Sequence, residues 1–228
     1  MRFEKDMKDP VSKQMKNYLD SNKYDMYQLA ELRAGIEADL AVHFYDNPSY
    51  TFDQMREIRL GLFSKVNVSL YTDPSIHHYK MRAIRLGLEH GLSMTAYLKK
   101  GYTGQQLMQI VTGLIDNVNI IWYENPAFSA QQMVEILTGL KKGIDVSTYA
   151  KVEIPPSEMK KMRKRIYMEY VEQYRQKLES EREEKERLRI KREAEKKEQK
   201  LLLDIAEHKN KIRRQKNRKR KERLSSNG

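Results

Sequence analysis

The sequence predicts an all-α protein in which tandem 26-residue units, each a long helix followed by a short helix, form an α-solenoid-like stack that precedes a long charged C-terminal helix. Three observations carry this prediction. Glycine recurs every 26 residues, at Gly35, Gly61, Gly87, Gly113 and Gly139. Tyrosine recurs at the same period, at Tyr45, Tyr71, Tyr97, Tyr123 and Tyr149. Residues 157–225 contain neither glycine nor proline and are rich in charge. A fixed period of this length is typical of repeat architectures.

Residues 1–23 precede the first unit and are predicted to form an N-terminal capping helix. Asp9-Pro10 leads into a short polar segment, which is a typical helix start. A terminal element with a polar outer face is what a stack of repeats needs at its end.

The five units occupy residues 24–154, and each opens with a helix-start signal. Four of them place a capping residue three positions before a glutamine, the spacing of a capping box; the pairs are Asp25 and Gln28, Thr51 and Gln54, Thr103 and Gln106, and Ser129 and Gln132. The third unit has His77 and Lys80 at these two positions, so a looser start is expected there.

Within a unit, the apolar residues follow the period of a helix. Met55, Ile58 and Leu62 lie on one face, and Gly61 lies on the same face. A glycine inside a helix costs about 1 kcal/mol relative to alanine, so its recurrence indicates close approach of a neighbouring helix. The long helix is then expected to end at a left-handed residue, at Gly91, Asn117 or Gly143 in three of the units.

Two further positions of the unit are candidates for contact. One repeated position holds a glutamate in three units, Glu31, Glu57 and Glu135, and the position two residues later holds Arg33, Arg59 and Arg85. This pattern indicates a solvated or inter-repeat ion-pairing face. Trp122 stands where other units have unrelated residues, which predicts partial exposure and a role as a protein-binding anchor. The alternative is that Trp122 is an ordinary residue at the edge of the core.

Residues 155–228 are predicted to form one long helix with a basic C-terminal tail. Met159, Met162 and Ile166 keep the register of the repeat and are expected to pack on the last unit. A helix of this length spans roughly 100 Å at 1.5 Å per residue. Heptad spacing begins at Tyr167, Val171, Tyr174 and Leu178 but fails at Glu181 and Lys185. Both a solvated single helix and a weak homodimeric coiled coil therefore remain open.

The basic surplus of the chain lies entirely in this last region. Residues 156–228 hold 26 Lys and Arg against 14 Asp and Glu, a surplus of 12 that equals the net charge of the whole chain. Ten of the basic residues fall within 209–223, namely Lys209, Lys211, Arg213, Arg214, Lys216, Arg218, Lys219, Arg220, Lys221 and Arg223. Such a run predicts binding to DNA or RNA through phosphates and without sequence preference. A solvated helix end, or an anionic membrane or other acidic partner, is the alternative.

The sequence shows no sign of catalytic, cofactor-binding or metal-binding residues. There is no cysteine, and the five histidines lack ligand spacing. No apolar run reaches the roughly 18–20 residues of a membrane span, and the first residues lack the apolar core of a signal peptide. A cytoplasmic protein that is not an enzyme, with no membrane span, is therefore expected.

The segments 54–62, 81–92 and 143–150 resemble a short helical repeat of poorly characterised proteins from Firmicutes, their phages and their integrative elements. The resemblance covers residues 25–165 and implies a bacterial or phage protein, with no catalytic residues to assign. Three functions follow as hypotheses. The first is a scaffold whose repeats bind a protein and whose tail binds nucleic acid, as in plasmid or mobile-element accessory factors. The others are a phage-encoded inhibitor of a host defence or transcription complex, and a structural spacer or oligomerisation protein.

Overall fold

The computed structural model describes residues 10–225, and every regular element within this range is helical. Residues 1–9 of the predicted capping segment, and residues 226–228, lie outside the described range. The chain divides into two compact units, residues 1–167 and residues 168–228, and each is described by itself.

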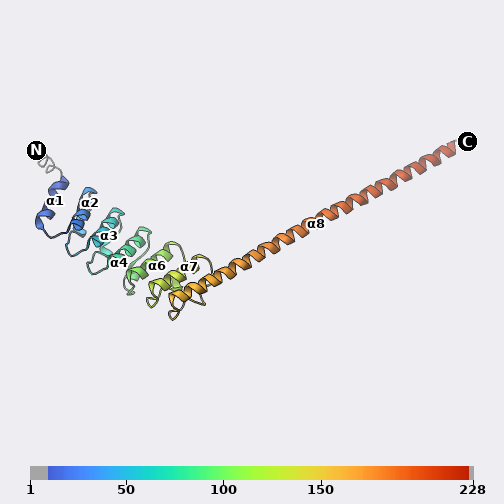
Figure 1. Cartoon of the computed structure of the whole chain (residues 1–228). Helices are drawn as coiled ribbons and strands as arrows, with labels where there is room; N and C mark the ends of the chain where they lie inside the picture. The colour runs from blue at the N-terminus through green and yellow to red at the C-terminus, as the bar shows by residue number, and fades with distance from the viewer. Residues whose placement is uncertain (1–9, 226–228) are drawn as a thin grey trace. The chain divides into compact units, whose positions relative to one another are not determined.

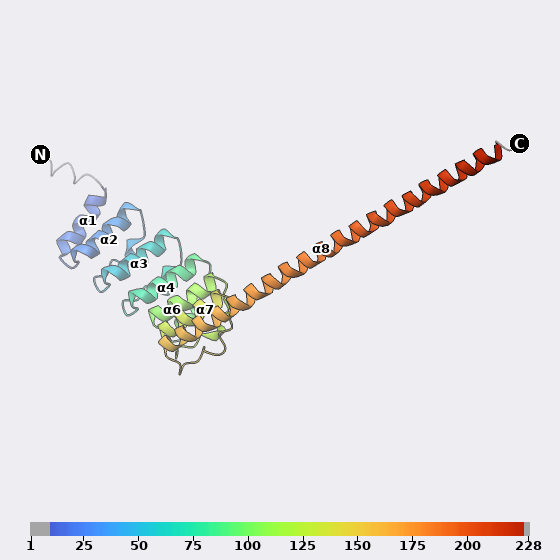
Figure 2. The ribbon, with the colours of Figure 1, turned by 45° about the vertical axis from the view of Figure 1, so that its right-hand side comes forward.

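The first unit is built from long helices, and from α2 onward they begin every 26 residues. These are α1 (Pro10–Ser21), α2 (Met26–Glu37), α3 (Phe52–Phe63), α4 (His78–Glu89), α6 (Gly104–Ile115), α7 (Ala130–Lys141) and the first turns of α8 (Pro156–Ser225). Short helices follow four of them, namely η2 (Val42–Phe44), η3 (Val68–Leu70), α5 (Thr95–Leu98) and η4 (Ile120–Trp122). Helices α2, α3, α4, α6 and α7 lie side by side in chain order (Figures 1 and 2). The prediction of an all-helical chain with a long C-terminal helix is confirmed.

The four predicted capping boxes are present, and their glutamines make a second set of contacts. The side-chain oxygen of Gln54 accepts from the backbone N–H of Thr51 at 2.8 Å, which closes the box. Its amide nitrogen donates to the carbonyls of Pro74 and Ile76, both at 2.8 Å, in the loop before the next long helix. Gln28, Gln106 and Gln132 repeat this arrangement. One buried side chain therefore both starts a helix and ties it to the next unit.

The close approach predicted at the repeated glycine comes from the short helix of the same unit and from the tyrosine that follows it. A Cβ on Gly61 would overlap the Tyr71 hydroxyl and would lie 2.9 Å from Val68 Cγ1. The Tyr71 hydroxyl donates to the carbonyl of Glu57 at 3.3 Å. Tyr45, Tyr123 and Tyr149 lie against Gly35, Gly113 and Gly139 in the same way. The glycine thus lets the segment that carries the tyrosine fold back onto the long helix of its own unit, and in three of these four units that segment includes a short helix.

The third unit departs from this pattern. Gly87 is covered by the side chain of Met94, which is fully buried, while Tyr97 is only half-buried. The segment around Tyr97 forms the α-helical turn α5 where other units have a 3₁₀ turn. The predicted equivalence of Tyr97 with the other four tyrosines was therefore wrong, because the longer Met94 side chain fills the space that they occupy.

The predicted left-handed helix ends are confirmed. Gly91, Asn117 and Gly143 have φ of +73°, +55° and +69°. Lys65 and Asp39 adopt the same conformation at +58° and +52°, although neither residue type favours it as glycine does.

The first turns of α8 complete the core of the first unit. Met159 is fully buried, and Met162 and Ile166 pack against the buried cluster, as predicted. In the second unit α8 continues from residue 168 to Ser225, and every described side chain from residue 172 to residue 217 is exposed.

Candidate binding surfaces

An apolar groove of about 420 Å³ runs across the exposed face of α4, α6 and α7. It is lined by Tyr79, Arg82, Leu86, Gly104, Gln105, Met108, Gln109, Ala130, Gln131 and Val134. All ten belong to long helices, and eight of them lie within the first five positions of a helix. This groove was not predicted from the sequence, because its residues form no recognisable motif.

Two small residues open the groove. The first helical position is Phe52 in α3 and His78 in α4, but Gly104 in α6 and Ala130 in α7. A Cβ on Gly104 would lie 2.5 Å from the backbone nitrogen of Lys80 and 2.6 Å from the carbonyl carbon of Tyr79. Gly104 therefore lets the start of α6 approach the backbone of α4. Between α2 and α3, by contrast, the rings of Tyr27 and Phe52 fill the equivalent space, with centroids 5.4 Å apart.

The groove carries a single charge. Arg82 is the one charged residue among its ten lining residues. Arg82 forms no ion pair with any residue in the described part of the chain, and its side chain is exposed. A second hollow, between α3 and α4, shares Tyr79 and Arg82 with the groove and adds Arg56. Three arginines and two carboxylates line this hollow, which is a surplus of one positive charge on the α3 side of the groove.

An ion-pair ladder joins successive long helices, and it is defined by Glu31–Arg59, Glu57–Arg85 and Glu135–Arg163, each pair 28 residues apart. The predicted inter-repeat ion pairing is confirmed for Arg59 and Arg85. Arg33 is exposed and takes no part, and Arg163 in α8 was missed. Each of these glutamates therefore pairs with the arginine of the next unit, 28 residues further along the chain, and not with the arginine two residues after it.

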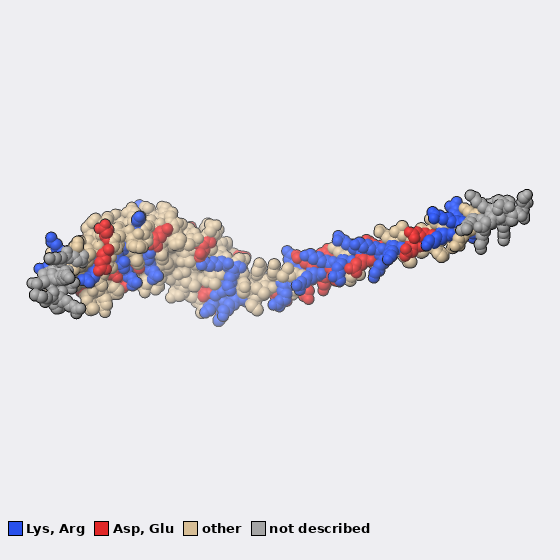
Figure 3. All heavy atoms as spheres, turned by 90° about the horizontal axis from the view of Figure 1, so that it is seen from above, with Lys and Arg blue, Asp and Glu red and all other residues tan. Residues whose placement is uncertain are grey.

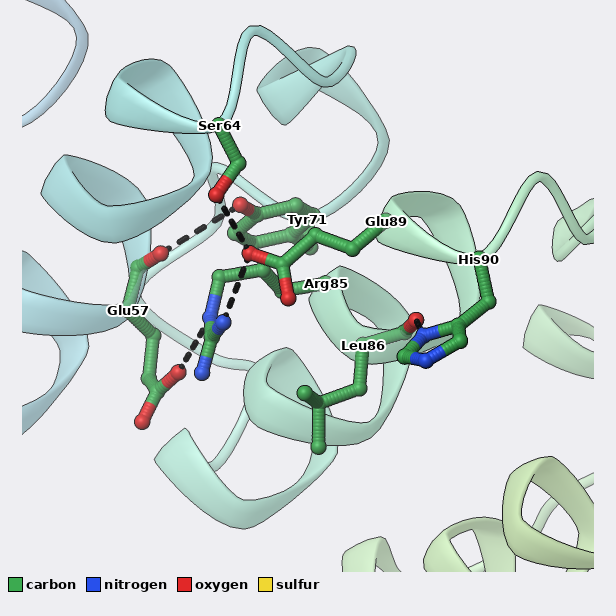
Figure 4. Close-up of polar contacts among 7 residues, drawn as sticks. All are labelled: Glu57, Ser64, Tyr71, Arg85, Leu86, Glu89 and His90. Carbon is green, nitrogen blue, oxygen red and sulfur yellow. Dashed lines mark hydrogen bonds and ion pairs between the residues drawn. The ribbon is translucent and has the colours of Figure 1, made fainter. Parts of the chain in front are cut away.

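Figure 4 shows the ion pair of this ladder that joins α3 and α4. Arg85 contacts Glu57 at 2.8 Å and Glu89 at 2.7 Å, and the Ser64 hydroxyl donates to Glu89 at 2.7 Å. Burial alone would lower the pKa of Arg85, but the hydrogen bonds to Glu57 and Glu89 raise it above its ordinary value. This guanidinium is therefore held as a structural cation. At the next two junctions the equivalent positions carry no charge. They hold Ala83 and Val111 between α4 and α6, and Gln109 and Leu137 between α6 and α7.

Trp122 is 39% exposed, and its neighbour Ile121 is 68% exposed. Both lie in η4, and neither lines the apolar groove. The predicted partial exposure of Trp122 is confirmed, while its role as a protein-binding anchor stays a prediction. Trp122 therefore lies outside the apolar groove.

The basic segment, residues 209–223, lies in the second unit. The side chains of Lys209, Lys211, Arg213, Arg214 and Lys216 are exposed, and none forms an ion pair with a described residue. The other five predicted residues lie in the backbone of α8, but their side chains are outside the described set: Arg218, Lys219, Arg220, Lys221 and Arg223. Upstream, acidic and basic side chains alternate along α8 (Figure 3), with pairs such as Glu172–Arg175 at 2.8 Å and Glu186–Arg189 at 3.0 Å.

Among the side chains that the structure describes, residues 10–217, no three metal-binding groups gather at one point. The same range holds no helix that is both long and apolar enough to cross a membrane. The hydroxyls of four buried tyrosines donate to backbone carbonyls, namely those of Tyr45, Tyr71, Tyr123 and Tyr149. Burial raises the pKa of Tyr149 to about 12, so its phenol is the neutral donor that joins this segment to the long helix of its unit.

Comparison of the chain with protein-family models, with curated proteins and with solved structures gives no match. The resemblance to short helical repeats of Firmicutes, phage and integrative-element proteins therefore stays a prediction.

Proposed function

We propose that this protein is a non-enzymatic adaptor of the cytoplasm, in which the long-helix face of an α-solenoid-like stack binds a protein and the basic segment of α8 binds nucleic acid without sequence preference. An accessory factor of a plasmid or other mobile element would need both activities. The proposal assigns the two activities to different units of the chain, so each can be tested while the other is left intact.

The observation that carries the proposal is the contrast in how the two units use their charges. In the first unit, arginines such as Arg59, Arg85 and Arg163 are neutralised in the ion-pair ladder. In the basic segment, the described cations face solvent on all sides of the helix without a carboxylate partner. A helix carrying cations all round can approach phosphates from any side, which suits binding by charge and not by base contacts.

The test is the salt dependence of binding to a short duplex of random sequence, measured by fluorescence anisotropy on the full chain. If five to ten phosphates are neutralised, the logarithm of the association constant should fall against the logarithm of salt with a slope of about −4 to −9. Replacing Lys209, Lys211, Arg213, Arg214 and Lys216 by Gln should reduce that slope by roughly half.

A matched variant replaces five basic residues upstream in α8 that lie among carboxylates: Arg182, Lys185, Arg187, Arg189 and Lys191. This variant loses the same charge and should bind much more tightly than the first one, because its basic segment is intact. Equal weakening of both variants would show that only net charge matters and would refute the assignment to residues 209–223. Binding that did not respond to salt would refute phosphate contact altogether.

One observation favours a second candidate, a structural spacer or oligomerisation arm. Leu201, Leu202 and Leu203 are 60–64% exposed on α8, and Ile205 and Ile212 continue the apolar residues. Light scattering of the full chain over a wide range of concentration distinguishes the two functions. A stable dimer that dissociates when Leu201 and Ile205 are replaced by Glu would favour the arm, and a monomer throughout would exclude it.

A further inference from the structure

We infer that the apolar groove of α4, α6 and α7 binds an amphipathic helix of a partner protein, with apolar side chains entering the groove and acidic residues facing Arg82 and Arg56. This inference rests on the proposed function, since it assigns a chemistry to the protein partner of the repeats. It commits to one occupant, an acidic amphipathic helix from another protein.

The shape of the groove favours side chains presented by a helix. Its volume of about 420 Å³ falls within the range of pockets that enclose a ligand. Leu86, Met108 and Val134 come from three successive long helices, and all three line the groove. Val134 and Tyr79 are 40% and 47% exposed, which leaves apolar surface that a partner can cover. An amphipathic helix places apolar residues at i, i+3, i+4 and i+7 into such a groove.

The charge of the groove selects the sign of the partner. Arg82 lines both the groove and the neighbouring hollow, where Arg56 joins it. The hollow is lined by three arginines, Arg56, Arg82 and Arg85, and by two carboxylates, Asp53 and Glu57, so the arginines exceed the carboxylates by one. Arg85 is held by Glu57 and Glu89, whereas Arg56 and Arg82 are exposed and form no ion pair with a described residue. A carboxylate brought to Arg82 gains a charge-assisted hydrogen bond, whereas an ammonium group there would be repelled.

Three amide side chains extend the polar capacity of the rim. Gln105, Gln109 and Gln131 line the groove, and none of them forms a side-chain hydrogen bond to a described residue. Each can donate and accept, so they can serve the polar face of a bound helix. By contrast Gln106 and Gln132, one residue further along, are fully engaged at the repeat junctions.

The test uses the full chain with the ten basic residues of 209–223 replaced by Gln, so that the tail cannot attract an acidic peptide. The probe is a fluorescent synthetic helix of about 18 residues, five turns, with leucines on one face and glutamates on the other. A second probe keeps the leucines and replaces the glutamates by lysines. We expect saturable binding of the acidic probe, and affinity for the lysine probe lower by about tenfold or more.

Variants place the binding in the groove. Val134→Glu should weaken binding of the acidic probe by at least about tenfold, and Arg82→Glu should reverse the preference between the two probes. Ile121→Glu is the matched control, because Ile121 is an exposed apolar residue outside the groove. Circular dichroism and Trp122 fluorescence show whether each variant is folded.

Several outcomes would overturn the inference: no saturable binding, equal affinity for the two probes, or Val134→Glu and Ile121→Glu variants that bind alike. If light scattering shows that Val134→Glu dissolves a dimer of the chain without probe, the occupant is a second copy, and the inference is wrong. Binding of the unmodified chain to duplex DNA is measured separately, with Val134→Glu included. If the chain with an intact groove fails to bind the acidic probe while the unmodified chain binds DNA, this inference alone is wrong; if the unmodified chain does not bind DNA, the proposed function is wrong.

Discussion

Removing one partner from the ion-pair ladder should destabilise the first unit far more than removing both. Glu135 is the chosen site, because its Oε2 accepts from Arg163 Nε and Nη2, both at 2.8 Å. The two side chains are only 14% and 11% exposed, so Glu135→Ala would leave a guanidinium largely buried without a counter-ion. Breaking a buried pair costs about 3–5 kcal/mol, and partial exposure reduces this to about 2–3 kcal/mol here. Because Arg163 belongs to α8, the start of that helix on α7 should loosen first.

The chain itself supplies the compensating change. At the equivalent positions of α4 and α6 the residues are Ala83 and Val111, and Val111 is 1% exposed. Glu135→Ala combined with Arg163→Val should therefore lie within about 1 kcal/mol of the parent chain, because an apolar pair replaces a buried ion pair at little cost. Urea unfolding followed by the fluorescence of the single Trp122 gives the free energy of unfolding. Glu153→Ala, at an exposed carboxylate, should change it by less than about 0.5 kcal/mol. If the double variant were as unstable as the sum of its two single variants, the reasoning would fail.

Three further predictions use the same unfolding measurements. Gly61→Ala should lower stability by about 2 kcal/mol, because its Cβ overlaps the Tyr71 hydroxyl, and adding Tyr71→Phe should recover part of the loss; purely additive effects would contradict the packing. Gln54→Ala removes three hydrogen bonds and should cost about 2–3 kcal/mol, whereas Lys80→Ala at the equivalent position should cost less than about 0.5 kcal/mol. Burial raises the pKa of Tyr149 from its ordinary value of 10 to about 12, so the stability that its neutral phenol contributes is complete below pH 10 and is lost as the pH rises towards 12. A tyrosinate absorbance titration should show this group ionising only with unfolding; ionisation together with the exposed tyrosines would argue against burial.

The helix starts could be predicted from the sequence because a capping box is a local arrangement. Thr51 and Gln54 are three residues apart, and their spacing alone defines the contact. The left-handed helix ends were likewise predictable from Gly91 and Gly143, since only the local backbone is involved. Such features need no knowledge of which unit contacts which.

Contacts between units could not be read in this way. The period showed that Glu57 and Arg59 recur together, but their offset of two residues on a helix places them on different faces. Only the stacking of helices shows that Glu57 reaches Arg85, 28 residues further on. The same holds for Gln54, whose amide reaches carbonyls 20 and 22 residues away. The recurring glycine indicated that something approaches closely, and the side chain involved was found only in three dimensions.

The departures of the third unit and the position of the groove have one physical explanation. Lys80 replaces the glutamine that ties each unit to the next loop, and that loop, residues 99–102, lacks the proline found in three other units. Without this tie the start of α6 is free to take another position, and Gly104 lets it settle against the backbone of α4. Ala83 and Val111 then replace an ion pair at the same interface, so no charge resists the closer contact. The apolar groove lies over this one irregular junction. Filling the groove from α7, with Ala130→Phe at the first helical position that Phe52 holds in α3, should therefore abolish binding of the acidic helix while the ion-pair ladder is kept.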